Sequence, residues 1–372
     1  MKKLLCLALI AAMLLMSCAA LAETATYDAI YTSDNPIPDI AERVRPAVVL
    51  VTVYAENWDA ATRVSSVDKL GLGSGCYIRA DENGNGGYIL TNNHIVTNAD
   101  SYTIQWLGSD EEQDVELVGT DDGTDIAVLH FEGAAPEGVT PIPLGDSDAL
   151  HIGELAICIG NHGVNVDNDI LPLLGTVTAG IISGVNREKI NADNFTRSVN
   201  VIQVDAPMNA GISGGALLNS KGELVGIPTL KYMYGTATVL EGLGFCIPIN
   251  AVKGFIDQII ETGRVVRPRI GLTITNIDGP DEPMKRFPPI GAQIVSIDDY
   301  GPCANVGLQV NDIITHVNDV RVYSFSDVLT QLDKCEAGDD TTLKIYRYYD
   351  AEGNLTGSYE TFDVTIQLEI ID

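Results

Sequence analysis

Between residues 47 and 262 the chain is a series of short apolar segments separated by turns rich in glycine and asparagine. Examples of these segments are 48–54, 155–159, 176–178, 199–204 and 223–227. Many short strands at this spacing predict barrels or sandwiches and argue against alternating β-α units. The 36 glycines agree, since glycine favours turns over helices. A mostly β fold is therefore expected.

The one convincing helix in this half comes at its end. Asn250 is expected to cap a helix over 251–262, whose apolar residues recur on one face and which Gly263 would terminate. Residues 263–269 then form a short basic linker, and 270–372 form a second, smaller unit.

The N-terminus reads as an export signal over residues 1–22, with two lysines, an unbroken apolar run and then small residues. Cleavage after this segment would give a mature chain that starts near Glu23, with an N-terminal segment over 23–45. Two alternatives remain open, because Cys18 follows a lipobox-like sequence and because the apolar run is long enough to stay as a membrane anchor. All three place the rest of the chain outside the cytoplasm, as a secreted, periplasmic or envelope-anchored protein.

The chain is strongly acidic, with a formal charge of −29 that becomes −31 once Lys2 and Lys3 leave with the signal. Such a surface repels phosphates, so nucleic acid is not an expected partner. The five cysteines that remain show no C-x-x-C spacing, which indicates neither a disulfide framework nor a zinc site. Residues 81–86 copy half of an EF-hand loop, but Asn92 stands where a bidentate glutamate is required. No metal and no organic cofactor are expected.

A glycine-rich turn carries the strongest chemical signal. Residues 211–215, Gly-Ile-Ser-Gly-Gly, fit the G-x-S-x-G pattern of a nucleophilic serine, which needs an imidazole and a carboxylate to activate it. The elbow of an α/β-hydrolase would place a helix directly after the serine and its histidine downstream. Residues 216–225 instead read as strand, turn and strand, and the only downstream histidine, His316, lies in the second unit. An α/β-hydrolase is therefore excluded.

The order His94, Asp125, Ser213 is that of chymotrypsin-type proteases. His94 directly follows one predicted strand, and Asp125 stands at the mouth of another. Two separate β-barrels could bring these residues together from their loops. The backbone N–H groups of Gly211 and Ser213 would then point at the developing oxyanion.

A family resemblance rests on a set of segments that occur in order between Pro46 and Asn250. They are "GLGSGCYI", "GYILTNNHIV", "TDIAVL", "GTVTAGIISG", "IQVDAPMNAGISGGALLNSKGELVGI" and "LGFCIPIN". With these segments the chain resembles the HtrA/Deg-type, trypsin-like serine proteases that carry one C-terminal PDZ domain. The resemblance implies two six-stranded antiparallel, chymotrypsin-like β-barrels over 46–262, a linker over 263–269 and a PDZ domain over 270–372.

The resemblance also implies roles. Carried over residue by residue, His94 is the general base, Asp125 its orienting acid and Ser213 the nucleophile. A homotrimer or a higher multiple is implied, with the N-terminal segment that carries Tyr27 and Tyr31 as a candidate contact.

Two positions beside the nucleophile depart from the family pattern. Ile212 replaces an asparagine and Ala210 replaces a proline. The oxyanion donors are backbone groups, so neither change removes one. The apolar side chain of Ile212 could nevertheless alter the resting conformation of the loop, which leaves its regulation open.

Substrate preference can be argued from the expected S1 pocket. Cleavage after Lys or Arg would need a carboxylate six residues before the serine, where this chain has Pro207. The predicted pocket wall, with Ile227 and Thr229, offers no charge either. Cleavage after small or medium aliphatic residues is therefore expected.

The second unit resembles a PDZ domain. Arg269, Ile270, Gly271 and Leu272 match the loop whose N–H groups hold the terminal carboxylate of a peptide, beside a helix expected over 324–332. The predicted function is that of an exported, ATP-independent endopeptidase acting on unfolded or misfolded proteins, with C-terminal peptides as PDZ ligands. The alternative is a catalytically silent peptide-binding chaperone or scaffold.

Overall fold

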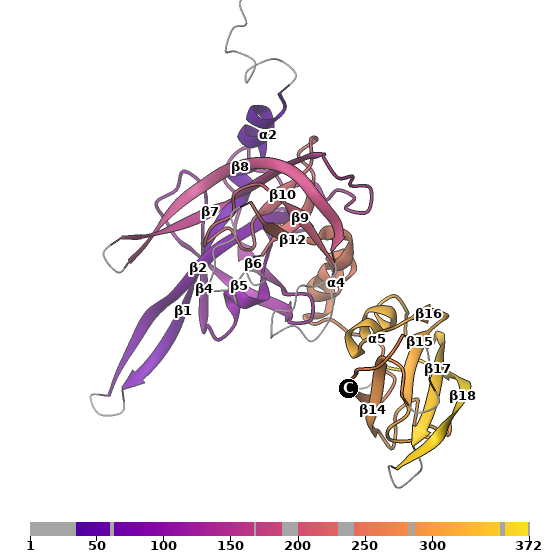
Figure 1. Ribbon diagram of the computed structural model, residues 1–372. Coiled ribbons are helices and arrows are strands. Elements are labelled where there is room, and N and C mark those ends of the chain that lie inside the picture. Colours follow the sequence, from indigo (N-terminus) through magenta and orange to yellow (C-terminus); the bar gives the residue numbers. More distant parts are fainter. Residues whose placement is uncertain are drawn as a thin grey trace, which may run out of the picture.

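The computed structural model describes residues 35–59, 63–166, 169–187, 200–229, 242–281, 284, 287–349 and 354–370. These residues form two closed β-barrels followed by a smaller C-terminal sheet, as predicted (Figure 1). The predicted signal segment, Cys18, Tyr27 and Tyr31 lie outside this range. Within it, no helix is long and apolar enough to cross a bilayer.

The first barrel closes in the strand order β1-β2-β3-β6-β5-β4. Its strands are β1 (Val48–Asp59), β2 (Val64–Ala80), β3 (Gly86–Thr91), β4 (Ser101–Gln105), β5 (Gln113–Asp121) and β6 (Ile126–Glu132). Tyr77, Trp106 and Phe131 pack edge to face at ring separations of 5.3–5.8 Å. This aromatic cluster is buried and helps to fill the barrel interior. A short helix, α3 (Asn93–Val96), follows β3.

The second barrel closes in the order β10-β11-β12-β9-β8-β7. Its strands are β7 (Leu155–Val166), β8 (Asp169–Arg187), β9 (Val201–Val204), β10 (Ala216–Leu218), β11 (Leu224–Pro228) and β12 (Gly244–Pro248). Alternate residues of β7 face opposite sides, as strand geometry requires. Ala156 and Cys158 face the interior of this barrel, while Ile157 and Ile159 join the core that is shared with the first barrel.

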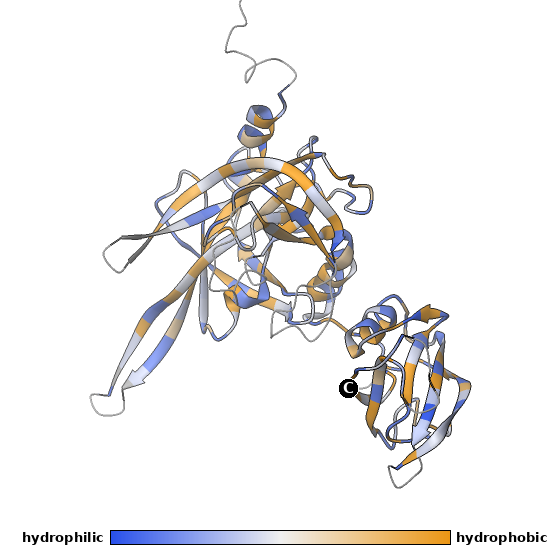
Figure 2. Ribbon diagram, viewed as in Figure 1, coloured by the Kyte–Doolittle hydropathy of each residue, from blue (hydrophilic) through white to orange (hydrophobic). Residues whose placement is uncertain are grey.

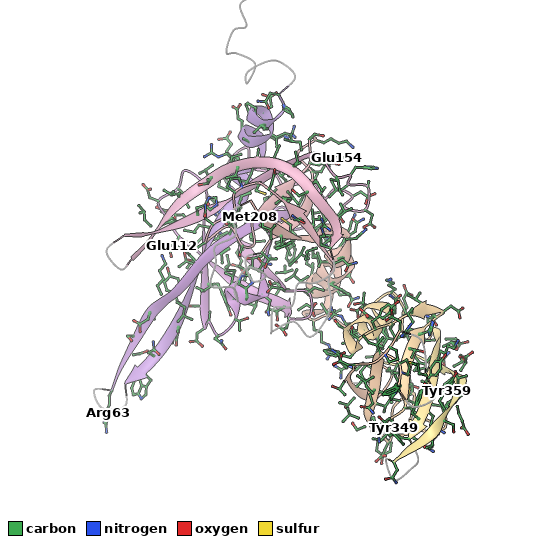
Figure 3. The ribbon with its side chains drawn as sticks, viewed as in Figure 1. Arg63, Glu112, Glu154, Met208, Tyr349 and Tyr359 are labelled. Carbon is green, nitrogen blue, oxygen red and sulfur yellow. The ribbon has the colours of Figure 1, made fainter. Side chains whose placement is uncertain are left out.

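Long hairpins extend from both barrels. Strands β1 and β2 project as a hairpin with Arg63 at its tip (Figure 3). Along the long strands hydrophobic residues alternate with hydrophilic ones (Figure 2). Near the hairpin tip even Trp58 and Val67 are exposed, so this part of the hairpin lies away from the core.

Helices flank the barrels at both ends of the domain. α2 (Ile37–Val44) and a turn of 3-10 helix, η2 (Arg45–Ala47), lead into β1, and α4 (Ile249–Thr262) follows β12. The expectation that Asn250 caps α4 was wrong, because the helix begins one residue earlier. The Asn250 N–H instead donates to the Ser147 hydroxyl, 3.1 Å away, which supplies the cap from a distant loop. Gly263 ends α4 with a φ of 76°, as expected.

The C-terminal unit is a sheet in the order β13-β14-β15-β17-β18, with β16 paired to β15. Its elements are β13 (Leu272–Ile277), β14 (Gly291–Ile297), β15 (Ile313–Val317), β16 (Val320–Arg321), α5 (Phe325–Leu332), β17 (Asp340–Tyr349) and β18 (Leu355–Gln367). The Ser324 hydroxyl caps α5 by accepting from the Asp327 N–H. Val328 and Leu332 turn into the core of this unit, which fixes the helix on the sheet.

Candidate active site

The first barrel holds His94 against Asp125. His94 Nδ1 lies 2.8 Å from one carboxylate oxygen of Asp125 and 3.0 Å from the other. The His94 backbone N–H also donates to that carboxylate, at 2.9 Å. Asp125 is fully buried, whereas the His94 side chain is about a quarter exposed. The imidazole is thus fixed at one ring nitrogen and accessible from solvent.

Local backbone geometry sets up this pair. Asp125 adopts a φ of 58°, a left-handed conformation that aspartate tolerates better than most residues. Its carbonyl accepts hydrogen bonds from the Asn93 N–H and the Asn92 side-chain amide. The two asparagines that follow β3 therefore tie the two loops together, which explains why asparagines stand directly before His94.

The second barrel also reaches the buried carboxylate. Thr229, at the end of β11, is fully buried and its hydroxyl lies 3.3 Å from Asp125 Oδ2. The sequence predicts Thr229 on the S1 wall, and no sequence pattern indicates its contact with Asp125. Ile227, expected on the same wall, is buried in the core shared by the two barrels.

Ser213 lies between glycines that the fold requires. Gly211 and Gly214 have φ values of 93° and 82°, where side chains are strained. A Cβ on Gly214 would clash with the Ser74 carbonyl and the Thr91 hydroxyl of the first barrel. Since Thr91 is three residues before His94, the serine loop packs beside the His–Asp pair.

The peptide between Ala210 and Gly211 has a defined direction. The Ala210 carbonyl accepts a hydrogen bond from the Gly163 N–H at 2.8 Å. Because a trans peptide points its N–H opposite to its C=O, the Gly211 N–H faces away from Gly163. Among the described residues nothing accepts a hydrogen bond from it. This N–H is available to an oxygen atom of a ligand.

Ile212 points away from the site. Its side chain is fully buried among apolar residues inside the second barrel, including Ala156, Cys158 and Ile182. It packs closely on Gly160, where an added Cβ would come within 2.8 Å of Ile212 Cγ1. The side chain therefore anchors the loop in the core and leaves the space around Ser213 unobstructed by it.

Arg267 connects the linker to the loop that carries Asp125. Its guanidinium donates two hydrogen bonds to Asp121, at 2.5 and 2.6 Å, and lies 3.2 Å from Asp333 after α5. Burial alone would raise the pKa of Asp121. The hydrogen bonds and charge of Arg267, together with hydrogen bonds from Thr124, outweigh the effect of burial. They hold the pKa of Asp121 below its ordinary value. Thr124 directly precedes Asp125, so the linker supports the turn of the buried acid.

The predicted carboxylate-binding loop opens the C-terminal unit. Gly271 has a φ of 70° and packs on Gly301, where no Cβ would fit. The carbonyls of Ile270 and Gly271 accept from Cys303 and Asp298. The following strand, β13, lies at one edge of the described sheet beside α5, and only β14 pairs with it. Such an edge can accept an added peptide strand.

Comparison with protein families gives two matches. Residues 73–227 match the model of a trypsin-like peptidase domain, and residues 268–366 match the model of a PDZ domain. The first range contains His94, Asp125 and Ser213, and the second contains all four residues of the predicted PDZ loop, together with α5.

Relatives and solved structures agree with these matches. The periplasmic serine endoprotease DegP of Escherichia coli K12 is 36% identical over 279 residues, which is 75% of this chain and 55% of DegP. The serine endoprotease DegS of Haemophilus influenzae is 33% identical over 323 residues, 86% of each chain. The HtrA-type protease AlgW, solved with a decapeptide, superposes with a TM-score of 0.66 at 24% identity and covers 90% of this chain and 98% of AlgW.

The extent of these matches differs between relatives. The chain spans about half the length of DegP but most of the length of DegS. In both cases the match covers at least three quarters of this chain. The chain belongs to the HtrA/Deg family of serine proteases, with a trypsin-like peptidase domain and one PDZ domain.

Proposed function

We propose that this protein is an exported, ATP-independent serine endopeptidase that degrades or processes unfolded or misfolded proteins. The observation that carries the proposal is the geometry around Ser213. The fixed His94–Asp125 pair lies beside the loop that carries Ser213, and the unoccupied Gly211 N–H belongs to that loop.

The proposed mechanism is acyl transfer. Asp125 binds His94 at Nδ1, which leaves Nε2 as the base for the Ser213 hydroxyl. Ser213 attacks the scissile carbonyl, and His94 then passes the proton to the leaving amine. The N–H groups of Gly211 and Ser213 stabilise the tetrahedral oxyanion, and water releases the acyl group by the same steps. Neither a metal nor an organic cofactor takes part.

The apolar lining near the loop supports cleavage after small or medium aliphatic residues. Pro207 is exposed and carries no charge, and its carbonyl accepts from the Thr178 hydroxyl. Met208 follows it and packs toward Gly244, over the second barrel (Figure 3). Ile227 lies in the core shared by the two barrels, so the support for this specificity comes from the uncharged Pro207 and Met208. Residues 230–241, which follow Thr229, lie outside the described range.

We further propose that C-terminal peptides bind along β13, with their carboxylate at Arg269–Leu272. AlgW was solved with a decapeptide, which supports peptides as ligands of this chain. The Arg267 bridge offers a route by which such binding would affect the Asp125 turn. Assembly as a homotrimer and an extracytoplasmic location complete the proposal. DegP and DegQ of Escherichia coli are named as periplasmic proteins, which supports that location.

Digestion of an unfolded protein tests the proposal. A reduced, carboxymethylated protein is incubated with the mature chain or with Ser213→Ala, and the new termini are sequenced by mass spectrometry. Cleavage after Val, Ala or Ile that disappears in the variant is expected. Dominant cleavage after Lys or Arg would refute the specificity. No cleavage by a folded protein that still binds C-terminal peptides would favour the silent chaperone or scaffold.

A further inference from the structure

We infer that Ser74 is a positioning residue for the oxyanion-binding loop, an inference that rests on the proposed peptidase function. Ser74 lies in β2 of the first barrel and is fully buried. It makes hydrogen bonds to the serine loop of the second barrel on both sides of Ile212. Its hydroxyl donates to the Gly211 carbonyl at 2.7 Å, and its N–H donates to the Ser213 carbonyl at 2.8 Å.

The hydroxyl of Ser74 has its own fixed direction. It accepts a hydrogen bond from the Asn161 N–H at 2.8 Å, so its one proton is directed to Gly211. The Ser74 carbonyl accepts from the Thr91 hydroxyl at 2.7 Å. Asn161 is itself held, since its side-chain amide donates to the Val49 carbonyl of the first barrel. The serine loop is therefore bound to a rigid and fully satisfied group.

The two peptides that flank the Gly211 Cα are pinned from opposite barrels. Gly163 in β7 holds the carbonyl before it, and Ser74 in β2 holds the carbonyl after it. With both peptide planes fixed, φ and ψ of Gly211 are fixed, and so is the direction of its N–H. Glycine alone would not maintain that direction, because it rotates more freely than any other residue.

This clamp also sets the loop relative to the proton-transfer pair. His94 and Asp125 belong to the first barrel, whereas the oxyanion donors belong to the second. Ser74 belongs to the same barrel as the pair and reaches across to the donors. Its hydrogen bonds thus align the groups that must act together on one substrate atom, which electrostatic stabilisation requires.

Ser74→Ala tests the inference. Loss of the hydroxyl is expected to lower kcat about 10- to 100-fold, less than the removal of an oxyanion donor itself, with KM unchanged. The Ki of a peptide boronic acid, whose tetrahedral adduct places an oxygen near the Gly211 N–H, should rise by the same factor. Thr103→Val is the matched control, since it removes another hydroxyl of this barrel that bonds to Glu112. The control should keep kcat and Ki within twofold of the parent.

Three results would overturn the inference. They are a kcat within twofold of the parent in Ser74→Ala, a fall in kcat with an unchanged boronate Ki, or an equal fall in Thr103→Val. Crystal structures of the parent and of Ser74→Ala provide a test that does not depend on activity. The peptides on either side of Gly211 should reorient in the variant. If they stay in place, Ser74 does not position them, and this holds even if the parent protein cleaves nothing.

Discussion

The two barrels share one strand order but contribute different chemistry. Counted within each barrel, the order 1-2-3-6-5-4 describes both. The connection between the third and fourth strands carries His94 in the first barrel and Ser213 in the second. The equivalent loop thus carries the proposed base in one barrel and the proposed nucleophile in the other.

The difference lies in how each loop is held. In the first barrel a buried carboxylate accepts hydrogen bonds from the loop that carries His94. In the second, a glycine-rich loop has no charge to organise it and depends on the buried Ile212 and on contacts from Ser74 and Gly163. One loop is fixed electrostatically, and the other by packing and by its neighbour.

The largest effect is expected from Ser213→Ala. Removal of the nucleophile should lower kcat on a fluorogenic peptide by about 10⁶, because the remaining groups cannot form an acyl-enzyme. Thermal unfolding should be almost unchanged, since the buried Ile212 and the contacts from Ser74 and Gly163 remain to hold the loop. Residual cleavage above about 1% of the parent rate would show that another residue is the nucleophile.

Asp125→Asn should come next, with a loss of about 10³–10⁴ in kcat, because an amide favours the wrong imidazole tautomer. The chain offers a matched control, as Asp81 forms a second aspartate–histidine pair with His130, at 3.0 Å. That pair lies near the start of β3, whereas His94 follows its end. Asp81→Asn should retain activity, and an equal loss there would mean that the effect is on folding.

Ile212→Asn tests the packing of the second loop. The substitution removes the free energy gained by burying isoleucine, and it places an amide without a hydrogen-bond partner in the apolar interior. Together these effects should lower the free energy of unfolding by about 4 kcal/mol. Urea denaturation measures this change. Ile212→Val is the conservative control and should cost about 1 kcal/mol. Equal stability of Ile212→Asn and the parent would show that Ile212 does not anchor the loop.

Arg267→Met addresses the support of the first loop. The substitution leaves the buried Asp121 carboxylate without its cation. It should lower the free energy of unfolding by about 3 kcal/mol at pH 7. The folded-state pKa of Asp121 is lowered, so this contribution is present above the unfolded pKa of about 3.9 and is lost as the pH falls through the folded value. The stability difference between parent and variant should therefore shrink in urea titrations at pH 3. A constant difference from pH 7 to pH 3 would contradict the assignment.

Much of this organisation is readable in the sequence, for identifiable reasons. Short strands and glycine turns predict the barrels, and the order of His94, Asp125 and Ser213, with the strand predicted after Ser213, selects this arrangement over a hydrolase elbow. Contacts that join distant segments are not readable in the same way. The role of Ser147 at α4 and the contact of Thr229 with Asp125 depend on how the barrels pack.

Ser74 shows the same limit. Ser74 lies in "GLGSGCYI", one of the segments that carry the family resemblance. A serine between two glycines is nevertheless typical of a turn. A polar residue that is fully buried inside a strand would indicate such a positioning role. Burial, however, is known only from the structure. The sequence does not show where the Ile212 side chain lies either. Only the structure shows that it points into the second barrel, away from the reactive groups.

Ser213 is proposed to be an activated nucleophile in a loop that is already in place. Fluorophosphonate labelling of the mature protein tests it most directly, with the adduct located by mass spectrometry and with His94→Ala beside the parent. We expect one adduct, on Ser213, that forms without any added peptide and is lost in His94→Ala. A folded parent protein that takes up no label, with or without an apolar C-terminal peptide, would contradict it.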